Sequence, residues 1–542
     1  MGCEVKLSGG NVIDGSGTPR RRADVAIEHG VITEIGDLAD LDAEKTVDCS
    51  GKTITPGFID IHSHTDWLLP DTDHGKLVEP FVRQGMTSLV GGNCGFSPAP
   101  ITDINRGAAQ DASRLIIDDA IDLRWNTMGE FLDGLDAGGV CLNVAQLVGH
   151  GSVRAAVTGP LNPDPPSSDE LAQMEKLTRE GLEAGCVGVS SGLGYPPGIF
   201  AQEDELAAFA GWAAREKKMF TSHLKAYSWI SPVFHTDPNV EPHNLEAIKE
   251  ILRVGEASGA RLQISHLIFV GRQTWSRAGD AIRLIEDANR RGIDTGFDAF
   301  PYTAGNTTAS VLFPPEILPQ LERVLGDEQE RAGLKAFADM AFEQIGFNLH
   351  DIQIMNCNVE RWNHLNGLFV NEAAERVDME PFDFYCRLVI DSDRMARVLI
   401  HTYSGDESDE SALRAVLEHP LCLVETDTFV TEAGHQNPAS YGTFPRALST
   451  YVAEGLFTLE EAVRRMTGGA AERLGWTDRG WVREGCAADL VVLDTDSLRD
   501  TATFQTPNRF PTGIDHVFIN GRHIVDGHSY DAAARAGKVL RS

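Results

Sequence analysis

The sequence predicts an α/β fold, namely a (β/α)8 barrel with a small β-sandwich domain formed by the N- and C-terminal segments. Two observations lead to this prediction. In the central region, eight β-rich runs alternate with amphipathic helical patterns, as in parallel sheets built from βαβ units. Both ends of the chain instead alternate apolar and polar residues between glycines, which is typical of short antiparallel strands. The 542 residues suffice for both parts, because a barrel alone takes about 250.

The two ends of the chain share one strand pattern. It is seen in VKLSGGNVIDG (5–15) near the N-terminus and in GIDHVFINGRHIVDG (513–527) near the C-terminus. The second stretch contains an Asn-Gly pair, which is typical of a two-residue hairpin turn. Because chain termini often lie close together, we expect residues 1–55 and 480–542 to form one small β domain.

The chain between these ends, residues 56–479, is predicted to form the barrel. Helical patterns such as 169–185 and 243–259 end in glycine after apolar residues spaced three and four apart, as helices do at their C-termini. Between the helical patterns, eight runs are predicted as buried strands: 57–64, 86–95, 143–151, 186–193, 219–225, 261–267, 293–302 and 422–427.

One connection in the barrel is too long. Between Tyr302 and Leu421 stand about 120 residues, where a β/α unit needs about 40. The stretch contains amphipathic segments such as FPPEILPQLERVL (313–325) and PFDFYCRLVI (381–390). We therefore expect a helical insertion at about 305–395, which forms a small lid or subdomain rather than a disordered loop.

Charge and composition exclude several kinds of partner. A formal net charge of −33 repels nucleic acid and anionic membranes, so we expect neither as a partner. The chain has no apolar run long enough to span a membrane and no secretion signal at its N-terminus, so a cytoplasmic location is predicted. Nine cysteines without a CxxC pair do not indicate a disulfide framework. The sequence does not determine the oligomeric state, and a homo-oligomer is compatible with it.

Six residues of metal-binding types lie near the ends of predicted strands, where the side chains of a parallel barrel converge on one face. Any one of them alone is more often structural, but six together are hard to explain as accidents. Two of them stand two residues apart on one strand, so their imidazoles point to the same side. Imidazole, thiolate and carboxylate together suit Zn²⁺, whose catalytic sites keep a position open for water. The six are His62, His64, Cys94, His223, His266 and Asp427.

Motifs along nearly the whole chain support a more specific interpretation. They include GFIDIHSH, QGMTSLVGGNCG, SSGLGYPPG, TSHLK, ISHL, FPYTAG, YGTFPRAL and GCAADLVVLD. With these motifs the sequence resembles the D-aminoacylases (N-acyl-D-amino-acid deacylases) of the amidohydrolase superfamily. Most other zinc amidohydrolases bridge their metals with a carboxylated lysine at the end of strand four. Here that strand, CVGVSSGL (186–193), has no lysine. The resemblance implies that Cys94 takes the bridging role.

The resemblance also implies a metal arrangement and a reaction. A tight zinc would be held by Cys94, His223 and His266, and a second, weaker position would lie between His62, His64, Cys94 and Asp427. The expected substrate is a small-molecule amide, foremost an N-acyl-D-amino acid. A metal-bound hydroxide would attack the amide, because the metal lowers the pKa of water toward about 7. Asp427 would take the proton of the water and pass it to the leaving amine.

The sequence departs from this family beside the predicted ligands. Ile268 stands where the family usually has a basic residue thought to hold the substrate carboxylate, and Thr428 stands where it usually has glycine. After the strand-five histidine the family tends to have arginine, whereas this chain has lysine. Four residues are therefore candidates for binding the substrate carboxylate or carbonyl: Lys225, Tyr195, Tyr302 and Arg272.

Other functions remain as alternatives. The substrate could be an amide without a free carboxylate, which would explain Ile268. It could also be a cyclic amide, as in hydantoinases, but that alternative requires the strand-four lysine that this chain lacks. A deaminase typically has glutamate three residues after the strand-five histidine, where this chain has Ala226. A catalytically silent scaffold is a further alternative, but such a protein would gain nothing from six costly buried polar groups.

Overall fold

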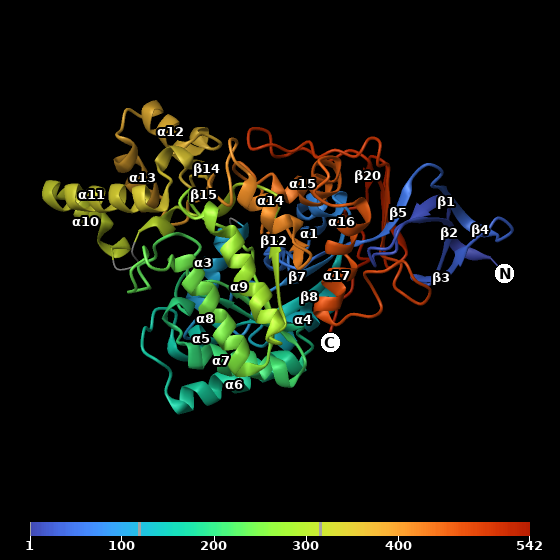
Figure 1. Ribbon diagram of the computed structural model, residues 1–542, viewed down its shortest axis with the longest axis horizontal. Helices are drawn as coiled ribbons and strands as arrows, with labels where there is room; N and C mark the ends of the chain where they lie inside the picture. Colours follow the sequence, from blue (N-terminus) through green and yellow to red (C-terminus); the bar gives the residue numbers. More distant parts are fainter. Residues whose placement is uncertain (1, 118–120, 314–316) are drawn as a thin grey trace.

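The molecule consists of a central barrel with a β domain at one end and the insertion at the other (Figure 1). The computed structural model describes residues 2–117, 121–313 and 317–542. Residues 314–316 of the predicted helical segment 313–325 lie outside the described residues. None of the helices in the described part of the chain combines the length and hydropathy needed to cross a bilayer.

The barrel contains all eight predicted strands, in the spatial order β16-β12-β11-β10-β9-β8-β7-β6, and neighbouring strands in this order pair in parallel. This confirms the predicted fold class. The strands are almost entirely buried, because helices cover their outer faces. Their bounds are β6 (Phe58–Asp60), β7 (Met86–Gly91), β8 (Asn143–Gly149), β9 (Gly188–Gly192), β10 (Met219–His223), β11 (Arg261–Ile264), β12 (Thr295–Ala299) and β16 (Cys422–Val424).

Side-chain and backbone hydrogen bonds join the first and last strands just beyond their ends. The carboxylate of Asp60 accepts hydrogen bonds from the backbone N–H and the hydroxyl of Thr426, at 3.1 and 2.6 Å. The backbone N–H of Asp427 donates to the carbonyl of His62 at 3.1 Å. Two of the predicted metal ligands therefore stand at the seam that closes the barrel.

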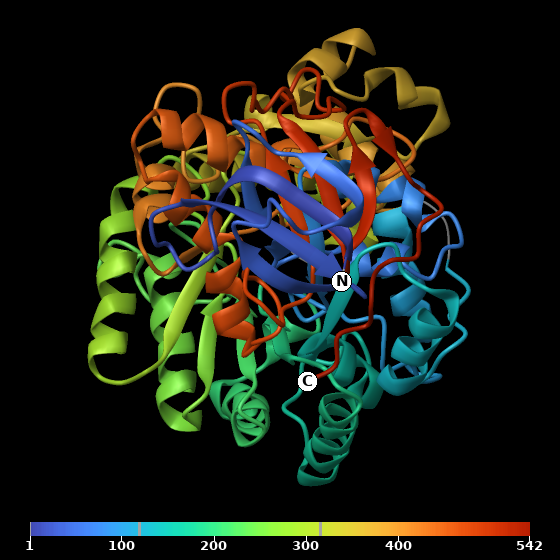
Figure 2. The ribbon, with the colours of Figure 1, turned by 90° about the vertical axis from the view of Figure 1, so that its right-hand side faces the viewer.

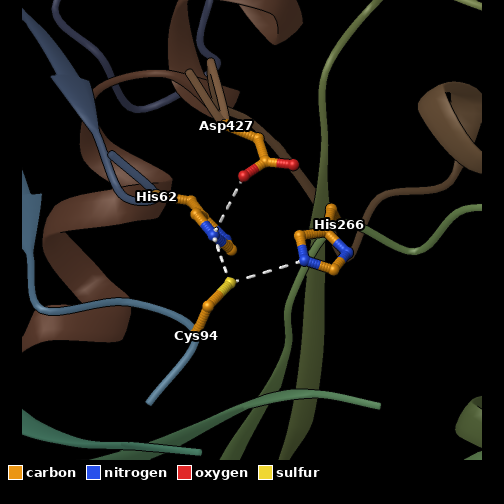
Figure 3. Close-up of side chains that lie close together, drawn as sticks. All are labelled: His62, Cys94, His266 and Asp427. Atoms are coloured by element: carbon orange, nitrogen blue, oxygen red, sulfur yellow. Dashed lines mark hydrogen bonds and ion pairs between the residues drawn. The ribbon is translucent and has the colours of Figure 1, made fainter. Parts of the chain in front are cut away.

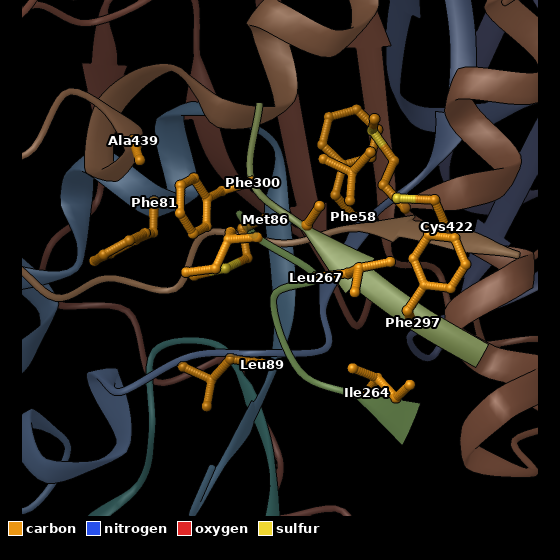
Figure 4. Packing of buried hydrophobic residues seen from close by; sticks show 14 of the residues in the cluster. Phe58, Phe81, Met86, Leu89, Ile264, Leu267, Phe297, Phe300, Cys422 and Ala439 are labelled. Carbon is orange, nitrogen blue, oxygen red and sulfur yellow. The ribbon is translucent and has the colours of Figure 1, made fainter. Parts of the chain in front are cut away.

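Helices surround the barrel and pack their apolar faces on it. Figure 4 shows part of this core, in which Phe58 of β6 lies 5.4 Å from the ring of Phe444 in α15. The helix α6 begins with a capping box formed by Ser167 and Glu170, and α8 ends at Gly259 in the left-handed conformation. The helices are α1 (His74–Leu77), α2 (Glu79–Arg83), α3 (Arg106–Ile117), α4 (Met128–Gly138), α5 (His150–Thr158), α6 (Ser168–Glu183), α7 (Glu203–Arg215), α8 (His243–Ser258), α9 (Ala278–Arg290), α14 (Ser411–Glu418), α15 (Ala439–Arg446), α16 (Leu459–Arg465) and α17 (Gly468–Leu474).

The β domain is one nine-stranded sheet that contains strands from both ends of the chain (Figure 2). The two ends meet where β5 pairs antiparallel with β17, with Pro56 opposite Leu490. Asn520 and Gly521 form the predicted turn, both with positive φ. The strands are β1 (Cys3–Val12), β2 (Arg21–Glu28), β3 (Val31–Gly36), β4 (Ala43–Asp48), β5 (Thr53–Pro56), β17 (Leu490–Leu493), β18 (Ile514–Ile519), β19 (Arg522–Asp526) and β20 (Ser529–Tyr530).

The last residues of the chain leave this sheet and run along the barrel. The backbone N–H of Val144 in β8 donates to the carbonyl of Lys538 at 2.9 Å, and that of Leu540 donates to the carbonyl of Val144 at 2.7 Å. The C-terminal residues therefore connect the two parts of the molecule.

The insertion between β12 and β16 contains the expected helices and also a sheet that the sequence did not predict. The sheet has three antiparallel strands in the order β13-β15-β14. Its strands are only four or five residues long, and apolar runs of that length do not distinguish strand from helix. The elements are α10 (Leu321–Gly326), α11 (Glu328–Ile345), α12 (Val370–Arg376), α13 (Pro381–Asp391), β13 (Gly305–Thr308), β14 (Ile352–Asn356) and β15 (Arg397–Ile400).

Candidate metal centre

Four of the six predicted ligands form one compact group at the mouth of the barrel (Figure 3). One donor atom from each of His62, Cys94, His266 and Asp427 lies within 4.8 Å of all the others. Cys94 Sγ is at the centre, 3.2 Å from His62 Nε2 and 3.6 Å from His266 Nε2. The Oδ1 of Asp427 lies 3.5 Å from His62 Nε2.

The remaining two predicted ligands adjoin this group. His223 Nδ1 lies 3.7 Å from Cys94 Sγ and 2.9 Å from His266 Nε2. His64 Nε2 lies 3.4 Å from Asp427 Oδ1. The fold therefore brings together all six side chains, from segments up to 365 positions apart in the chain (62 to 427).

Three of the six residues have unusual backbone conformations. Cys94, His266 and Asp427 have φ values of 53°, 32° and 42°, in the left-handed region that residues with a Cβ rarely adopt. The backbone is closely packed around Cys94, since a Cβ on Gly192 would lie 2.0 Å from the Cys94 carbonyl oxygen. Such strained residues cluster at functional sites, where the surrounding structure holds them in place.

Asp298, at the end of the seventh barrel strand β12, supports two of the histidines, and the sequence analysis did not single it out. One of its carboxylate oxygens accepts a hydrogen bond from the backbone N–H of His266 at 2.7 Å and lies 3.2 Å from His62 Nδ1. The other accepts from the amide of Gln263 at 2.7 Å. A carboxylate behind a histidine fixes the orientation of the ring and its tautomer, as in many metal sites.

Two tyrosines pack against the centre. The Tyr227 ring lies 5.0 Å from the rings of both His223 and His266, and its hydroxyl accepts from the backbone N–H of Leu224 at 2.8 Å. Tyr195 donates a hydrogen bond to the carbonyl of Cys94 at 2.8 Å. Both rings therefore restrict the positions of the ligand side chains.

The local charges favour the metal-binding forms of the cysteine and the aspartate. Burial opposes ionisation of Cys94, but the charge of His62 and hydrogen bonds with His223 and His266 hold the pKa of its thiol well below the usual value. Burial also opposes ionisation of Asp427, but His266 and the hydrogen bond with His64 lower the pKa of its carboxyl. Thiolate and carboxylate are the forms that bind a metal.

The donor spacing fits a zinc ion. Bonds of about 2.3 Å to sulfur and about 2.1 Å to nitrogen at tetrahedral angles separate the two donors by about 3.6 Å. Cys94 Sγ lies 3.6 Å from His266 Nε2 and 3.7 Å from His223 Nδ1. Imidazole and thiolate are also ligands that zinc prefers.

A second group of metal-binding residues lies in the β domain, where His516, His523 and Asp526 are close together. There the Nζ of Lys45 already lies 2.7 Å from His523 Nδ1 and 3.3 Å from Asp526 Oδ2. Because a lysine ammonium already interacts with this group, we do not interpret it as a metal site.

The structure places the four candidate substrate-binding residues differently from one another. Lys225 is buried against Glu250, with Nζ 2.5 Å from its carboxylate. Arg272 is held by Asp351 and Asp406, each at 2.9 Å. The Tyr302 hydroxyl donates to Asp500 at 3.0 Å. Tyr195 contacts a predicted ligand directly, because its hydroxyl donates to the carbonyl of Cys94.

A parallel eight-stranded barrel with histidine, cysteine and aspartate donors at the carboxyl ends of its strands defines the class of metal-dependent barrel hydrolases. The sequence pattern of the Amidohydrolase family matches residues 45–313 and 384–525, and the chain belongs to this family. The residues between the two matched parts, 314–383, lie in the insertion.

Proteins of known activity are similar to the chain over nearly its whole length. The D-aminoacylase of Alcaligenes xylosoxydans xylosoxydans is 31% identical, and the match covers 99% of this chain and 97% of the relative. The N-acyl-D-glutamate deacylase of the same organism is 32% identical, and the match covers 99% of this chain and 96% of the relative. A solved structure of the N-acyl-D-glutamate deacylase from Bordetella bronchiseptica, complexed with zinc and a phosphonate inhibitor, is 30% identical with a TM-score of 0.82 and full coverage of both chains. The predicted family resemblance is confirmed, and the chain is an amide-hydrolysing enzyme.

Proposed function

We propose that the protein hydrolyses linear N-acyl amides, foremost N-acyl-D-amino acids, with zinc at the centre around Cys94. The observation that carries this proposal is the position of the Cys94 thiol among the histidines at the mouth of a barrel whose fourth strand, β9, contains no lysine. The names of the two Alcaligenes relatives support the substrate class.

The six residues divide into two sets of ligands in this proposal. Cys94, His223 and His266 would hold one zinc tightly, as the distances of 3.7 and 3.6 Å from the Cys94 sulfur to the two imidazole nitrogens suggest. His62, His64 and Asp427, together with Cys94, would form a second and weaker position. A zinc ion bound here would polarise the amide carbonyl and make water more acidic.

Asp427 is the proposed general base and acid. Its carboxylate is held between His62 and His64 and is exposed enough to meet a substrate, with 17% of its side chain accessible. Water adds to the carbonyl carbon and gives its proton to Asp427. The carbon–nitrogen bond then breaks, and the same proton goes to the nitrogen, so that a neutral amine can leave.

A second candidate substrate class is an amide without a free carboxylate. Ile268 is buried two residues after His266, and the cations Lys225 and Arg272 are already paired with carboxylates. These contacts favour such an amide unless another cation binds the substrate.

A hydrolysis screen tests the proposal. Purified protein with measured zinc content would be assayed on matched N-acetyl-D- and N-acetyl-L-amino acids, on amides without a carboxylate and on cyclic amides. We expect zinc-dependent hydrolysis with a preference for the D-amino acids. Activity restricted to carboxylate-free or cyclic amides would contradict the substrate class, and a protein inactive after zinc addition would contradict the enzymatic role.

A further inference from the structure

The turn 92–95 follows strand β7 and carries Cys94 to the metal centre. Gly92, Cys94 and Gly95 have φ values of 73°, 53° and 74°. Among these three residues Cys94 is the one with a Cβ, so the left-handed conformation costs it free energy. Such a conformation persists only where the surrounding structure holds it, so the hydrogen bonds of the turn determine where the Cys94 sulfur lies.

The hydroxyl of Ser190 on strand β9 joins the two ends of this turn. It donates a hydrogen bond to the carbonyl of Gly92 and accepts one from the backbone N–H of Gly95, the latter at 3.0 Å. Ser190 is fully buried, so bulk water does not compete for either bond. One side chain of the fourth barrel strand therefore satisfies a backbone acceptor and a backbone donor on opposite sides of Cys94.

Two other contacts hold one end of the turn each. The Asp66 carboxylate accepts from the backbone N–H of Gly92 at 2.9 Å. The backbone N–H of Ser152 donates to the carbonyl of Gly95 at 3.0 Å. Strand β8 lies between β7 and β9 and ends at Gly149, where a Cβ would lie 2.5 Å from the Gly95 carbonyl oxygen. The lack of a side chain at Gly149 thus allows the turn to lie over β8 and reach β9.

We propose that Ser190 is a positioning residue for the metal centre, whose hydroxyl fixes the turn so that the Cys94 sulfur stays among the histidines. This inference rests on the proposed function, because it requires that Cys94 binds zinc. Without the hydroxyl, the Gly92 carbonyl and the Gly95 N–H would both lose a buried partner, and Cys94 would be held less firmly. The fourth strand, which has no lysine, then serves the metal through the position of the cysteine.

The test removes one buried hydroxyl at a time from the same strand. Ser190→Ala breaks both bonds to the turn, whereas the matched control Ser191→Ala removes a hydroxyl that donates to Ser222 at 2.9 Å. The zinc affinity of each apoprotein is measured by competition with a chromogenic chelator. We expect Ser190→Ala to bind zinc about 10- to 100-fold more weakly than the parent, as for outer partners of metal sites. Ser191→Ala should stay within about threefold of the parent, a difference of less than 1 kcal/mol.

Cobalt substitution separates this role from a general loss of stability. Cobalt(II) bound to a thiolate has a sulfur-to-metal charge-transfer band, whose energy and intensity depend on the geometry of the bond between sulfur and metal. At saturating cobalt, this band should change in Ser190→Ala and match the parent in Ser191→Ala. A parent-like affinity and band in Ser190→Ala, or equal changes in both variants, would overturn the role of Ser190 and leave the proposed function intact. A parent that binds neither zinc nor cobalt would overturn both.

Discussion

Cys94 occupies a position that a purely structural cysteine would not need. Its sulfur touches three imidazoles, and its backbone is held in the left-handed region. A non-glycine residue in that region costs on the order of 1 kcal/mol or more. Gly192 packs so closely against the Cys94 carbonyl that a side chain at position 192 would clash with it. The Cys94 thiol is thus already in position to bind an ion that lies between the histidines.

Replacement of Cys94 by alanine should remove this central donor. We expect Cys94→Ala to bind zinc more than about 100-fold more weakly than the parent, since even outer partners of a metal site contribute about 10- to 100-fold. Competition with a chromogenic chelator measures the affinity. Cys141→Ala is the control, because Cys141 is also buried but is not part of the group around Cys94. Equal zinc affinity in Cys94→Ala and the parent would contradict the assignment.

Asp427 should matter for turnover more than for the tighter metal position. We expect Asp427→Ala to keep the zinc bound to Cys94, His223 and His266 but to lose about 10²- to 10⁴-fold in kcat, the usual contribution of a general base or acid. Zinc content and kcat are measured on the same preparation. A variant with the kcat of the parent, or one that has lost all its zinc, would show that the role is wrong.

At the level of single residues, the sequence predicted the six clustered side chains but not Asp298. Ligand types at strand ends are visible in a sequence, whereas the hydrogen bonds of Asp298 to His266 and Gln263 arise only when strands β11 and β12 pair. A buried aspartate between apolar residues is a signal that needs explanation. That signal alone does not suffice, because Glu425 is equally buried and its two carboxylate oxygens have no hydrogen-bond partner among the described residues.

The strand β12 contributes to the centre through Asp298, which contacts the His62 ring and the His266 backbone at two other strand ends. We expect Asp298→Asn to weaken zinc binding by about 10- to 100-fold, because the amide is a poorer acceptor for the His266 backbone and does not hold the His62 ring as a carboxylate does. The chelator assay measures the change. Asp500→Asn is the control, since Asp500 is also buried but bonds Tyr302. Equal losses in both variants would point to a general effect on folding.

Whole elements could be predicted where the pattern is local. All eight barrel strands lie within the predicted segments, because short β-rich runs between helical patterns are visible in the sequence. The sheet of the insertion could not be predicted, since β13, β14 and β15 are short and become strands only by pairing with one another.

At the scale of the whole molecule, the two ends of the chain were expected to meet because both show alternating apolar and polar residues. The structure has this contact, since β5 pairs with β17. The contact of the last residues with β8 could not be predicted in this way, because it consists of individual backbone hydrogen bonds that leave no pattern in the sequence. The insertion also meets the C-terminal segment. There the ring of His401, which follows β15, lies 4.5 Å from that of Phe504. Its Nε2 donates to Gln353 at 2.9 Å.

This junction should make the stability of the molecule depend on pH. Burial lowers the pKa of His401 from 6.5 to about 4, so the folded protein binds this proton less readily than the unfolded chain. The contribution of His401 to stability is therefore present above about pH 6.5 and is lost as the pH falls toward 4. Between pH 7 and pH 5 the expected loss is about 2 kcal/mol from this one group.

Urea unfolding at pH 7 and pH 5 measures this dependence. The decrease in unfolding free energy should be about 2 kcal/mol smaller in His401→Gln than in the parent, because glutamine has no proton to gain. His364→Gln is the control, since His364 lies exposed in the same insertion and its replacement should leave the decrease unchanged. The comparison between variants subtracts the effect of acid on the metal ligands, which all three proteins share. An equal decrease in His401→Gln and the parent would show that the acid sensitivity arises elsewhere in the molecule.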